Sequence, residues 1–104
     1  MIVLSSCEYE SEISLSQVRP LLICSRDGYP IKSIAFSIKQ DGIYNKAFEY
    51  DFRNTMTCTN IDSLFENKGG ALKNNKGYSV YIKTSKGSKG INFIIRNDSI
   101  IVIK

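Results

Sequence analysis

The sequence predicts a small α+β domain that is mostly β, with an antiparallel sheet of about five to six strands and one short helix near residues 60–68. Three observations lead to this prediction. Hydrophobic residues make up 42% of the 104 residues, which is enough for one core. Strand-favouring Ile, Val, Tyr, Phe and Thr are plentiful and alanine is scarce. Seven glycines, together with Asn and Asp, supply turns. We therefore expect residues 1–104 to form a single domain.

The first part of the chain predicts two short strands and a turn. Ile2–Tyr9 is apolar at its start and ends in an acidic segment, so we expect a first strand there. Apolar residues within Ser14–Cys24 follow a helical spacing, but Pro20 would lie inside that helix and disfavour it. We therefore predict a bend at Pro20, a strand over Leu21–Ser25 and a turn over Arg26–Pro30.

Residues 34–52 predict a β-hairpin, because apolar and polar residues alternate on both sides of Asp41-Gly42. A strict two-residue loop would place the apolar residues of the two strands on different faces. With Ile43 as a third loop residue, Phe36 faces Phe48, as a sheet buried on one side requires. We therefore predict a bulged or three-residue turn.

The second strand of this hairpin is rich in aromatic residues, and we expect its phenyl rings in the core. An exposed aromatic platform is the alternative. The residues concerned are Tyr44, Phe48, Tyr50 and Phe52.

The segment Thr59–Glu66 predicts a short helix, with Thr59 or Asn60 as its N-cap, acidic residues in its first turns and Gly69-Gly70 at its end. A further helical turn over residues 71–73 is an alternative to a loop there.

The C-terminal part predicts a meander of three strands, over Tyr78–Lys83, Ile91–Arg96 and Ser99–Ile103. The run Ile100–Ile103 is apolar at every position, and the strand before it has apolar residues on both faces. Because such patterns are typical of strands buried on both sides, we predict that these two strands are central and covered on both faces.

The chain contains three cysteines and no histidine. The cysteines lack C-x-x-C spacing, so a zinc site would be missing its usual ligands, and we expect neither a metal nor a cofactor. Without histidine, the Ser-His and Cys-His mechanisms are excluded. Glu49 and Asp51 alternate along a strand in the manner of a solvated sheet face. We therefore expect a protein that is not an enzyme.

The cysteines also bear on location. An odd number of them cannot all pair within one chain, so an intracellular protein with buried or free thiols is the simplest interpretation, and we expect the cytoplasm. Leu4-Ser5-Ser6-Cys7, however, resembles the lipobox of a bacterial lipoprotein signal, and the acidic segment after it resembles the one that follows the lipobox in some surface lipoproteins. This resemblance implies export and a lipid anchor on Cys7, with Cys24 and Cys58 left as a candidate disulfide.

Only four residues, Met1–Leu4, form the apolar run before this motif, whereas a signal has roughly 7–15. Either the start lies upstream or the likeness is chance, and we favour an ordinary first strand. We find no apolar run of the roughly 18 residues that a membrane helix needs, so we predict no transmembrane segment.

Charge is divided unevenly along the chain. Residues 1–66 carry a net charge of −3, and residues 67–104 carry +7. Such polarity can steer a protein towards an acidic partner, although a lysine-rich solvated surface would look the same. The candidate binding residues are lysines of the C-terminal loops and two tyrosines beside them: Lys68, Lys73, Lys76, Lys83, Lys86, Lys89, Tyr78 and Tyr81.

From these features we expect a small non-enzymatic interaction protein, an inhibitor or antidote of the kind that phage, plasmid or toxin systems use. Its partner would be an acidic protein surface that meets the lysine-rich loops. An exported, lipid-anchored binding module is the alternative. A nucleic-acid-binding protein comes third, because basic residues interleaved with aromatics are typical of single-strand binding surfaces while the helix-turn-helix, zinc-finger and RNP motifs are missing.

Overall fold

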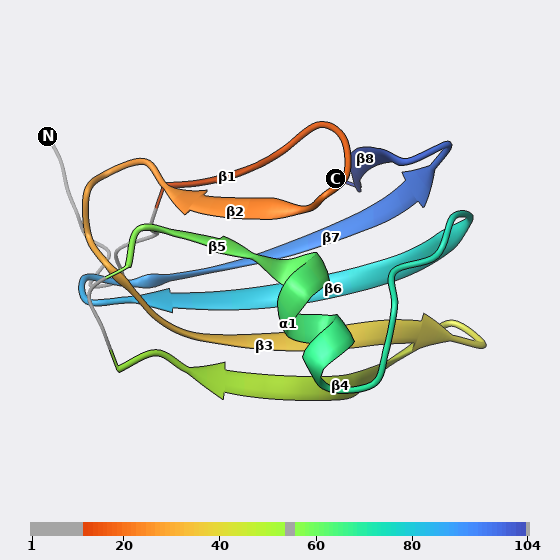
Figure 1. Cartoon of the computed structure of the whole chain (residues 1–104), viewed down its shortest axis with the longest axis horizontal. Helices are drawn as coiled ribbons and strands as arrows, with labels where there is room; N and C mark the ends of the chain where they lie inside the picture. Colours follow the sequence, from red (N-terminus) through yellow and green to blue (C-terminus); the bar gives the residue numbers. More distant parts are fainter. Residues whose placement is uncertain (1–11, 54–55, 104) are drawn as a thin grey trace, which may run out of the picture.

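The computed structural model describes residues 12–53 and 56–103, and the strand expected over Ile2–Tyr9 lies outside them. The described chain forms two antiparallel sheets and a short helix (Figure 1), which confirms the prediction of a mostly β, α+β fold. The larger sheet has the strand order β4-β3-β6-β7-β8 and the smaller sheet β1-β2-β5. The bounds are β1 Ile13–Leu15, β2 Leu22–Ser25, β3 Ile31–Gln40, β4 Ile43–Asp51, β5 Cys58–Asn60, α1 Ile61–Asn67, β6 Lys76–Thr84, β7 Ser88–Arg96 and β8 Ser99–Ile103.

One hydrophobic core joins the two sheets and the helix. Phe36 on β3 lies at its centre, with ring centroids 5.4 Å from those of Phe48, Phe65 and Tyr78. The smaller sheet contributes Ile23, which is fully buried. Figure 1 shows α1 in front of β3 and β6, so the helix covers the same face of the larger sheet as these side chains.

The aromatic hairpin has the predicted register but a different turn. Phe36 pairs with Phe48, as predicted, yet Gln40 pairs with Ile43, so Asp41 and Gly42 form a strict two-residue loop. Both loop residues have positive φ, 53° and 80°, as the tight turns that match the twist of a hairpin require.

The extra residue lies inside β4 instead. The register shifts between Phe36 and Ser37, which pair with Phe48 and Lys46, so Ala47 forms a β-bulge. The prediction of a three-residue turn is therefore wrong. One strand does contain an extra residue that brings Phe36 opposite Phe48, but this residue is Ala47 in β4 and does not lie in the turn. Of the aromatic residues, Phe48 is buried, while Tyr44 and Tyr50 are 36% and 38% exposed.

The short helix begins and ends as predicted. The side chain of Asn60 accepts a hydrogen bond from the backbone N–H of Ser63, which makes it the N-cap. Gly69, with a φ of 86°, follows the last turn, and its N–H donates to the carbonyl of Glu66. Residues 71–73 are irregular and form no further helical turn, but Leu72 is buried and holds this loop against the core.

The meander β6-β7-β8 is confirmed, and β7 is central in the sheet, but the prediction that β7 and β8 are covered on both faces is wrong. On the outer face of β7, Asn92 and Arg96 are exposed. β8 is an edge strand, and Ile101, Val102 and Ile103 are 45%, 47% and 39% exposed. Ile100 is buried, and its N–H donates to the carbonyl of Gln17, so the start of the strand is bonded on its outer side. An unbroken apolar run cannot distinguish a covered strand from an exposed apolar edge.

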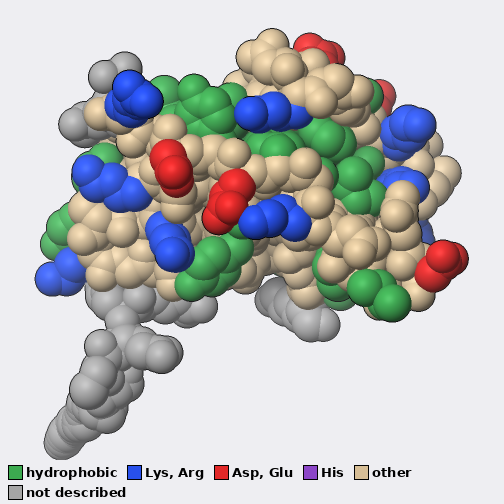
Figure 2. Space-filling model, turned by 90° about the horizontal axis from the view of Figure 1, so that it is seen from below, with side chains coloured by type: hydrophobic (Ala, Val, Ile, Leu, Met, Phe, Trp, Pro, Cys, Tyr) green, Lys and Arg blue, Asp and Glu red, His purple; other side chains and the backbone are tan. Residues whose placement is uncertain are grey.

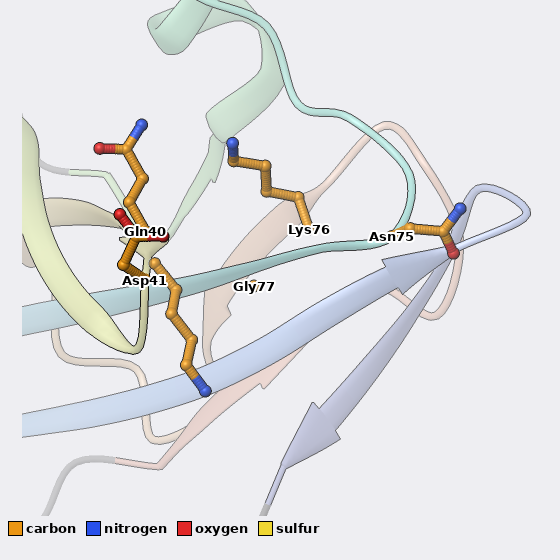
Figure 3. A pocket seen from close by; sticks show the side chains of 6 residues that line it. Gln40, Asp41, Asn75, Lys76 and Gly77 are labelled. Atoms are coloured by element: carbon orange, nitrogen blue, oxygen red, sulfur yellow. The ribbon is translucent and has the colours of Figure 1, made fainter.

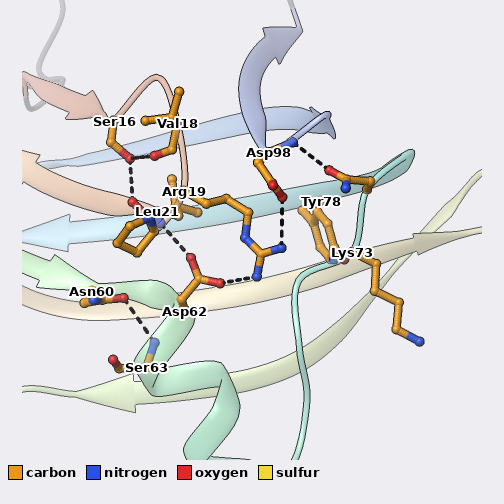
Figure 4. A network of polar contacts seen from close by, with 12 residues as sticks. Ser16, Val18, Arg19, Leu21, Asn60, Asp62, Ser63, Lys73, Tyr78 and Asp98 are labelled. Atoms are coloured by element: carbon orange, nitrogen blue, oxygen red, sulfur yellow. Dashed lines mark hydrogen bonds and ion pairs between the residues drawn. The ribbon is translucent and has the colours of Figure 1, made fainter.

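The bend at Pro20 is confirmed and is held by an ion-pair network (Figure 4). Arg19 Nη2 donates to Asp62 Oδ1 at 2.8 Å, and Asp62 Oδ2 accepts the N–H of Leu21 at 2.7 Å. The backbone N–H of Arg19 donates to the carbonyl of Asp98 at 2.9 Å. The hydrogen bond with Asp62 raises the pKa of Arg19, so the guanidinium stays charged. This network ties the chain before β2 to α1 and to the β7-β8 turn.

Cys24 on β2 and Cys58 on β5 lie directly opposite each other and form a disulfide. Their Cα atoms are 4.1 Å apart, and 34 positions separate them in the sequence. The bond therefore joins the chain before the aromatic hairpin to the strand that leads into α1.

Candidate functional site

The structure divides the predicted lysine surface into two groups at opposite ends of β6. Lys76 begins this strand, and Lys68 and Lys73 precede it. Lys83, Lys86 and Lys89 surround the β6-β7 turn, at the other end of the strand in Figure 1. Nine residues of extended chain span roughly 26 Å, so the six lysines do not form one surface.

The two predicted tyrosines also separate. Tyr78 lies in the core with 1% of its surface exposed, which corrects the expectation that it lines a binding surface. Its pKa is raised because burial disfavours the charged phenolate. Tyr81 is on the opposite face of β6 and 45% exposed, and its hydroxyl donates to Ser88 Oγ at 2.9 Å. Because side chains alternate along a strand, residues three positions apart lie on different faces.

At the turn end of β6, the lysines are dispersed. Lys86 lies in the tight turn, and its Nζ is 5.9 Å from the centre of the Tyr29 ring. Lys83 is exposed on the outer face of the sheet beside Tyr81, whereas Lys89 pairs with Ile82 and lies on the core side. Lys89 lines a depression of about 420 Å³ with apolar residues of β1, β7 and β8. Lys83 and Lys89 lie on opposite faces of a paired part of the sheet, so they cannot meet one ligand together.

The other end of β6 forms a groove at the tip of the aromatic hairpin. The pairing of β3 with β6 ends at Ile38 and Tyr78, and beyond this pair the two strands enclose a depression of about 570 Å³. We call it the hairpin-tip groove, and its lining residues are Lys39, Gln40, Asp41, Asn75, Lys76 and Gly77. In Figure 3, the side chains of Gln40 and Lys76 point to the same side of the sheet, across the gap between the strands.

Local backbone geometry opens this groove. Asp41 begins the two-residue turn with a φ of 53°. Asn75 has a φ of 62°, and its N–H donates to the carbonyl of Ile95 at 2.6 Å, which anchors the start of β6 to β7. Asn and Asp tolerate this left-handed conformation better than most residues. Both walls of the groove therefore carry the residue types that their turns require.

The stem of Lys39 passes close to Gly77, so a side chain at position 77 would require Lys39 to shift by a few tenths of an ångström. A Cβ atom there would lie 3.3 Å from Cβ and Cδ of Lys39. The Lys39 ammonium also lies 5.7 Å from the centre of the Tyr44 ring. Lys39 is thus held on the outer side of the sheet while Lys76 stands on the helix side, so a ligand at the tip meets positive charge from both sides.

Lys73 is positioned beside this groove by a core residue. Its backbone N–H donates to the hydroxyl of Tyr78 at 2.8 Å, and its neighbour Leu72 is buried. The side chain of Lys73 is exposed. Lys68, after the end of α1, is exposed but does not line the groove.

The groove presents several polar groups that could bind a ligand. Its lining has amide, ammonium and backbone groups and a single carboxylate, on Asp41. Among residues 12–53 and 56–103, no group of three or more His, Cys, Asp and Glu residues could hold a metal ion. The same part of the chain contains no helix long and apolar enough to cross a membrane.

Positive charge elsewhere is spread out. Figure 2 shows the molecule from below the view of Figure 1, with Lys and Arg side chains over its whole length and acidic side chains among them. On β4, Lys46 Nζ contacts Glu49 Oε1 at 2.9 Å, and this hydrogen bond lowers the pKa of Glu49. No continuous basic track is visible on this face.

No family model matches the sequence, and comparisons with curated proteins and with solved structures find no match.

Sequence reasoning identified Lys73 and Lys76 but missed Lys39, Gln40, Asp41 and Asn75 as their neighbours. Lys39 and Lys76 are far apart in the sequence, and they meet only because β3 pairs with β6. The turn signals at Asp41-Gly42 and Asn74-Asn75 mark both loops in the sequence, but nothing local indicates that these loops are adjacent.

Proposed function

We propose that the protein is a non-enzymatic binding module that holds an acidic segment of a partner protein in the hairpin-tip groove. The observation that carries this proposal is that Lys39 and Lys76, from two strands far apart in the sequence, line one depression with a single acidic residue in its lining. Lys73 lines a smaller depression beside it, which also contains Lys76. Lysine ammonium groups are exposed donors that attract carboxylates, and such contacts steer association and select partners.

The arrangement favours a short acidic protein segment over a nucleic acid. A single strand of nucleic acid binds along a continuous basic groove with aromatic rings on which its bases stack. Here the two lysine groups are roughly 26 Å apart along β6, and Tyr78 is buried. A groove of about 570 Å³ at one end of the sheet suits a few residues of a partner. Inhibition or neutralisation of an acidic protein, as in phage, plasmid or toxin systems, is the role that we propose for such binding.

Charge reversal tests this proposal. The groove variant is Lys39→Glu with Lys76→Glu, and the matched control is Lys83→Glu with Lys86→Glu, which changes the net charge equally at the other end of β6. The probes are a fluorescein-labelled oligoglutamate peptide and a labelled oligothymidylate, with binding followed by fluorescence anisotropy from about 50 to about 200 mM NaCl. Circular dichroism confirms that both variants are folded.

We expect the oligoglutamate to bind more tightly than the oligothymidylate, and the groove variant to lose about tenfold in affinity for it. The control variant should lose less than threefold. Equal losses in the two variants would show that only net charge matters and would overturn the assignment of the groove. Tighter binding of the oligothymidylate, lost in both variants, would favour a nucleic-acid partner.

A second candidate is that this binding module is exported and anchored by lipid on Cys7. The specific observation in its favour is the Cys24–Cys58 disulfide, because disulfides persist mainly in oxidising compartments. With these two cysteines paired, Cys7 is the remaining cysteine of the three, and it lies in the lipobox-like Leu4-Ser5-Ser6-Cys7.

Metabolic labelling with radioactive palmitate in the native host distinguishes this candidate from a cytoplasmic protein. We expect the label on the native protein, in the membrane fraction, and its loss in the Cys7→Ala variant. An unlabelled native protein in the soluble cytoplasmic fraction would contradict export.

A further inference from the structure

A second, smaller depression adjoins the hairpin-tip groove and shares Gln40 and Lys76 with it. Its volume is about 240 Å³, and it opens between the end of β3 and the irregular chain after α1. We call it the apolar notch. Its lining residues are Ile38, Gln40, Phe65, Gly70, Ala71, Lys73, Lys76 and Tyr78.

The notch combines an apolar floor with a cationic rim. Phe65 and Tyr78 are buried to 6% and 1% exposure, and Ile38 is partly buried against the same core. Lys73 and Lys76 also line the notch, and Lys76 lines the groove as well. A ligand in the notch therefore contacts the apolar floor and has ammonium groups beside it.

The floor of the notch is fixed before any ligand arrives. The ring of Phe65 lies 5.4 Å from that of Phe36 and 5.6 Å from that of Phe48, measured between centroids. The chain at Gly70 runs so closely against the same ring that a Cβ atom there would clash with Phe65 Cε1. Only glycine fits this position. A preformed site costs little ordering entropy on binding.

The size of the notch limits its occupant. Pockets for drug-sized ligands and cofactors have volumes of roughly 300–1,000 Å³, and the notch is smaller than these. One aliphatic or aromatic side chain fits. Because ammonium groups border it, the residues on either side of that side chain must be compatible with positive charge.

We propose that the apolar notch receives one hydrophobic side chain of the acidic segment that the hairpin-tip groove binds. The partner motif is then a Leu, Ile, Met or Phe residue flanked by Asp or Glu, with the carboxylates at Lys73 and Lys76. This inference rests on the proposed function and adds the hydrophobic residue to it. The acidic residues bring the segment to the tip, and the hydrophobic residue fixes its register.

Two short peptides of glutamates, one with a central leucine and one with a central serine, test the notch. Isothermal titration calorimetry measures their affinities for the native protein and for two variants at Ala71, which is exposed at the rim. Ala71→Trp fills the notch without a change of charge, and Ala71→Ser is the matched control. Thermal unfolding checks that each variant is folded.

We expect the leucine peptide to bind the native protein roughly 5- to 30-fold more tightly than the serine peptide, because it buries an aliphatic side chain. Ala71→Trp should abolish this preference by weakening the binding of the leucine peptide, while Ala71→Ser keeps the preference.

Equal affinities for the two peptides, still dependent on Lys39 and Lys76, would refute the proposal that the notch binds a hydrophobic side chain. The proposed function of the groove would remain supported. A leucine preference that survives Ala71→Trp would place the hydrophobic side chain elsewhere and also overturn it. Failure of both peptides to bind would overturn the groove and the notch together.

Discussion

Replacement of both residues of the Cys24–Cys58 pair by alanine should lower the free energy of unfolding by about 3–4 kcal/mol. The magnitude follows from the 34 positions that separate the two cysteines, since a cross-link of that span restricts the unfolded chain. Cys58 is exposed and Cys24 is half-buried, so lost packing adds little. Small domains are stable by only about 5–15 kcal/mol, and the loss is therefore a large fraction of the total.

Urea denaturation followed by far-ultraviolet circular dichroism measures this change. We would make the measurement in a Cys7→Ser background, so that the two cysteines of interest are the only ones left. The oxidised protein, the same protein with dithiothreitol and the Cys24→Ala, Cys58→Ala variant form a matched series. The reduced protein and the variant should agree within about 1 kcal/mol, because both lack the same cross-link.

Thiol titration of the denatured, unreduced Cys7→Ser protein gives an independent result, and we expect no free thiols. Two free thiols in protein from the native host, or a loss of stability below about 1 kcal/mol in the series, would refute the reasoning from the disulfide. Either result would also remove the observation that favours export.

Three further predictions concern the fold. Asp62→Ala removes the acceptor of the Leu21 amide and the ion-pair partner of Arg19. Urea denaturation should show a loss of about 2–3 kcal/mol in the free energy of unfolding. A loss below about 0.5 kcal/mol would contradict the claim that this network stabilises the bend. Burial raises the pKa of Tyr78 above its ordinary value of 10.0. The buried, protonated hydroxyl of Tyr78 therefore contributes its full stability below pH 10, and this contribution is lost as the pH rises through the folded-state pKa. Tyr78→Phe should make the unfolding free energy less sensitive to pH above 10, and an unchanged slope would argue against this cause. Deletion of Ala47 removes the bulge but keeps the residues that follow it in register, so the protein should still fold, with unchanged near-ultraviolet circular dichroism; loss of the fold would show that the bulge is essential.

Local chemistry was enough to predict several elements. The pairing of Phe36 with Phe48 follows from the requirement that both strands present their apolar residues to the same side. The helix cap at Asn60 and the exit at Gly69 follow from the backbone geometry that these positions need. In each case, residues close in the sequence, or joined by one turn, determine the outcome.

Other features depend on which segments come together. The extra residue of the hairpin could lie in the turn or in a strand, because either position restores the same register, and the structure places it at Ala47. The exposure of Ile101 and Val102 follows from the place of β8 at the edge of the sheet, which an apolar run does not reveal. Burial of Tyr78 likewise depends on the neighbours of β6 and not on its own segment.

By itself, the sequence determined that this is a mostly β protein with a capped short helix, no histidine and a basic C-terminal half. Only the tertiary structure decided that the predicted lysines form two groups, and that Lys39 joins Lys76 at the tip of the hairpin. The physical reason is that charge and periodicity are properties of a segment, whereas a binding groove forms where distant strands such as β3 and β6 pair and then diverge.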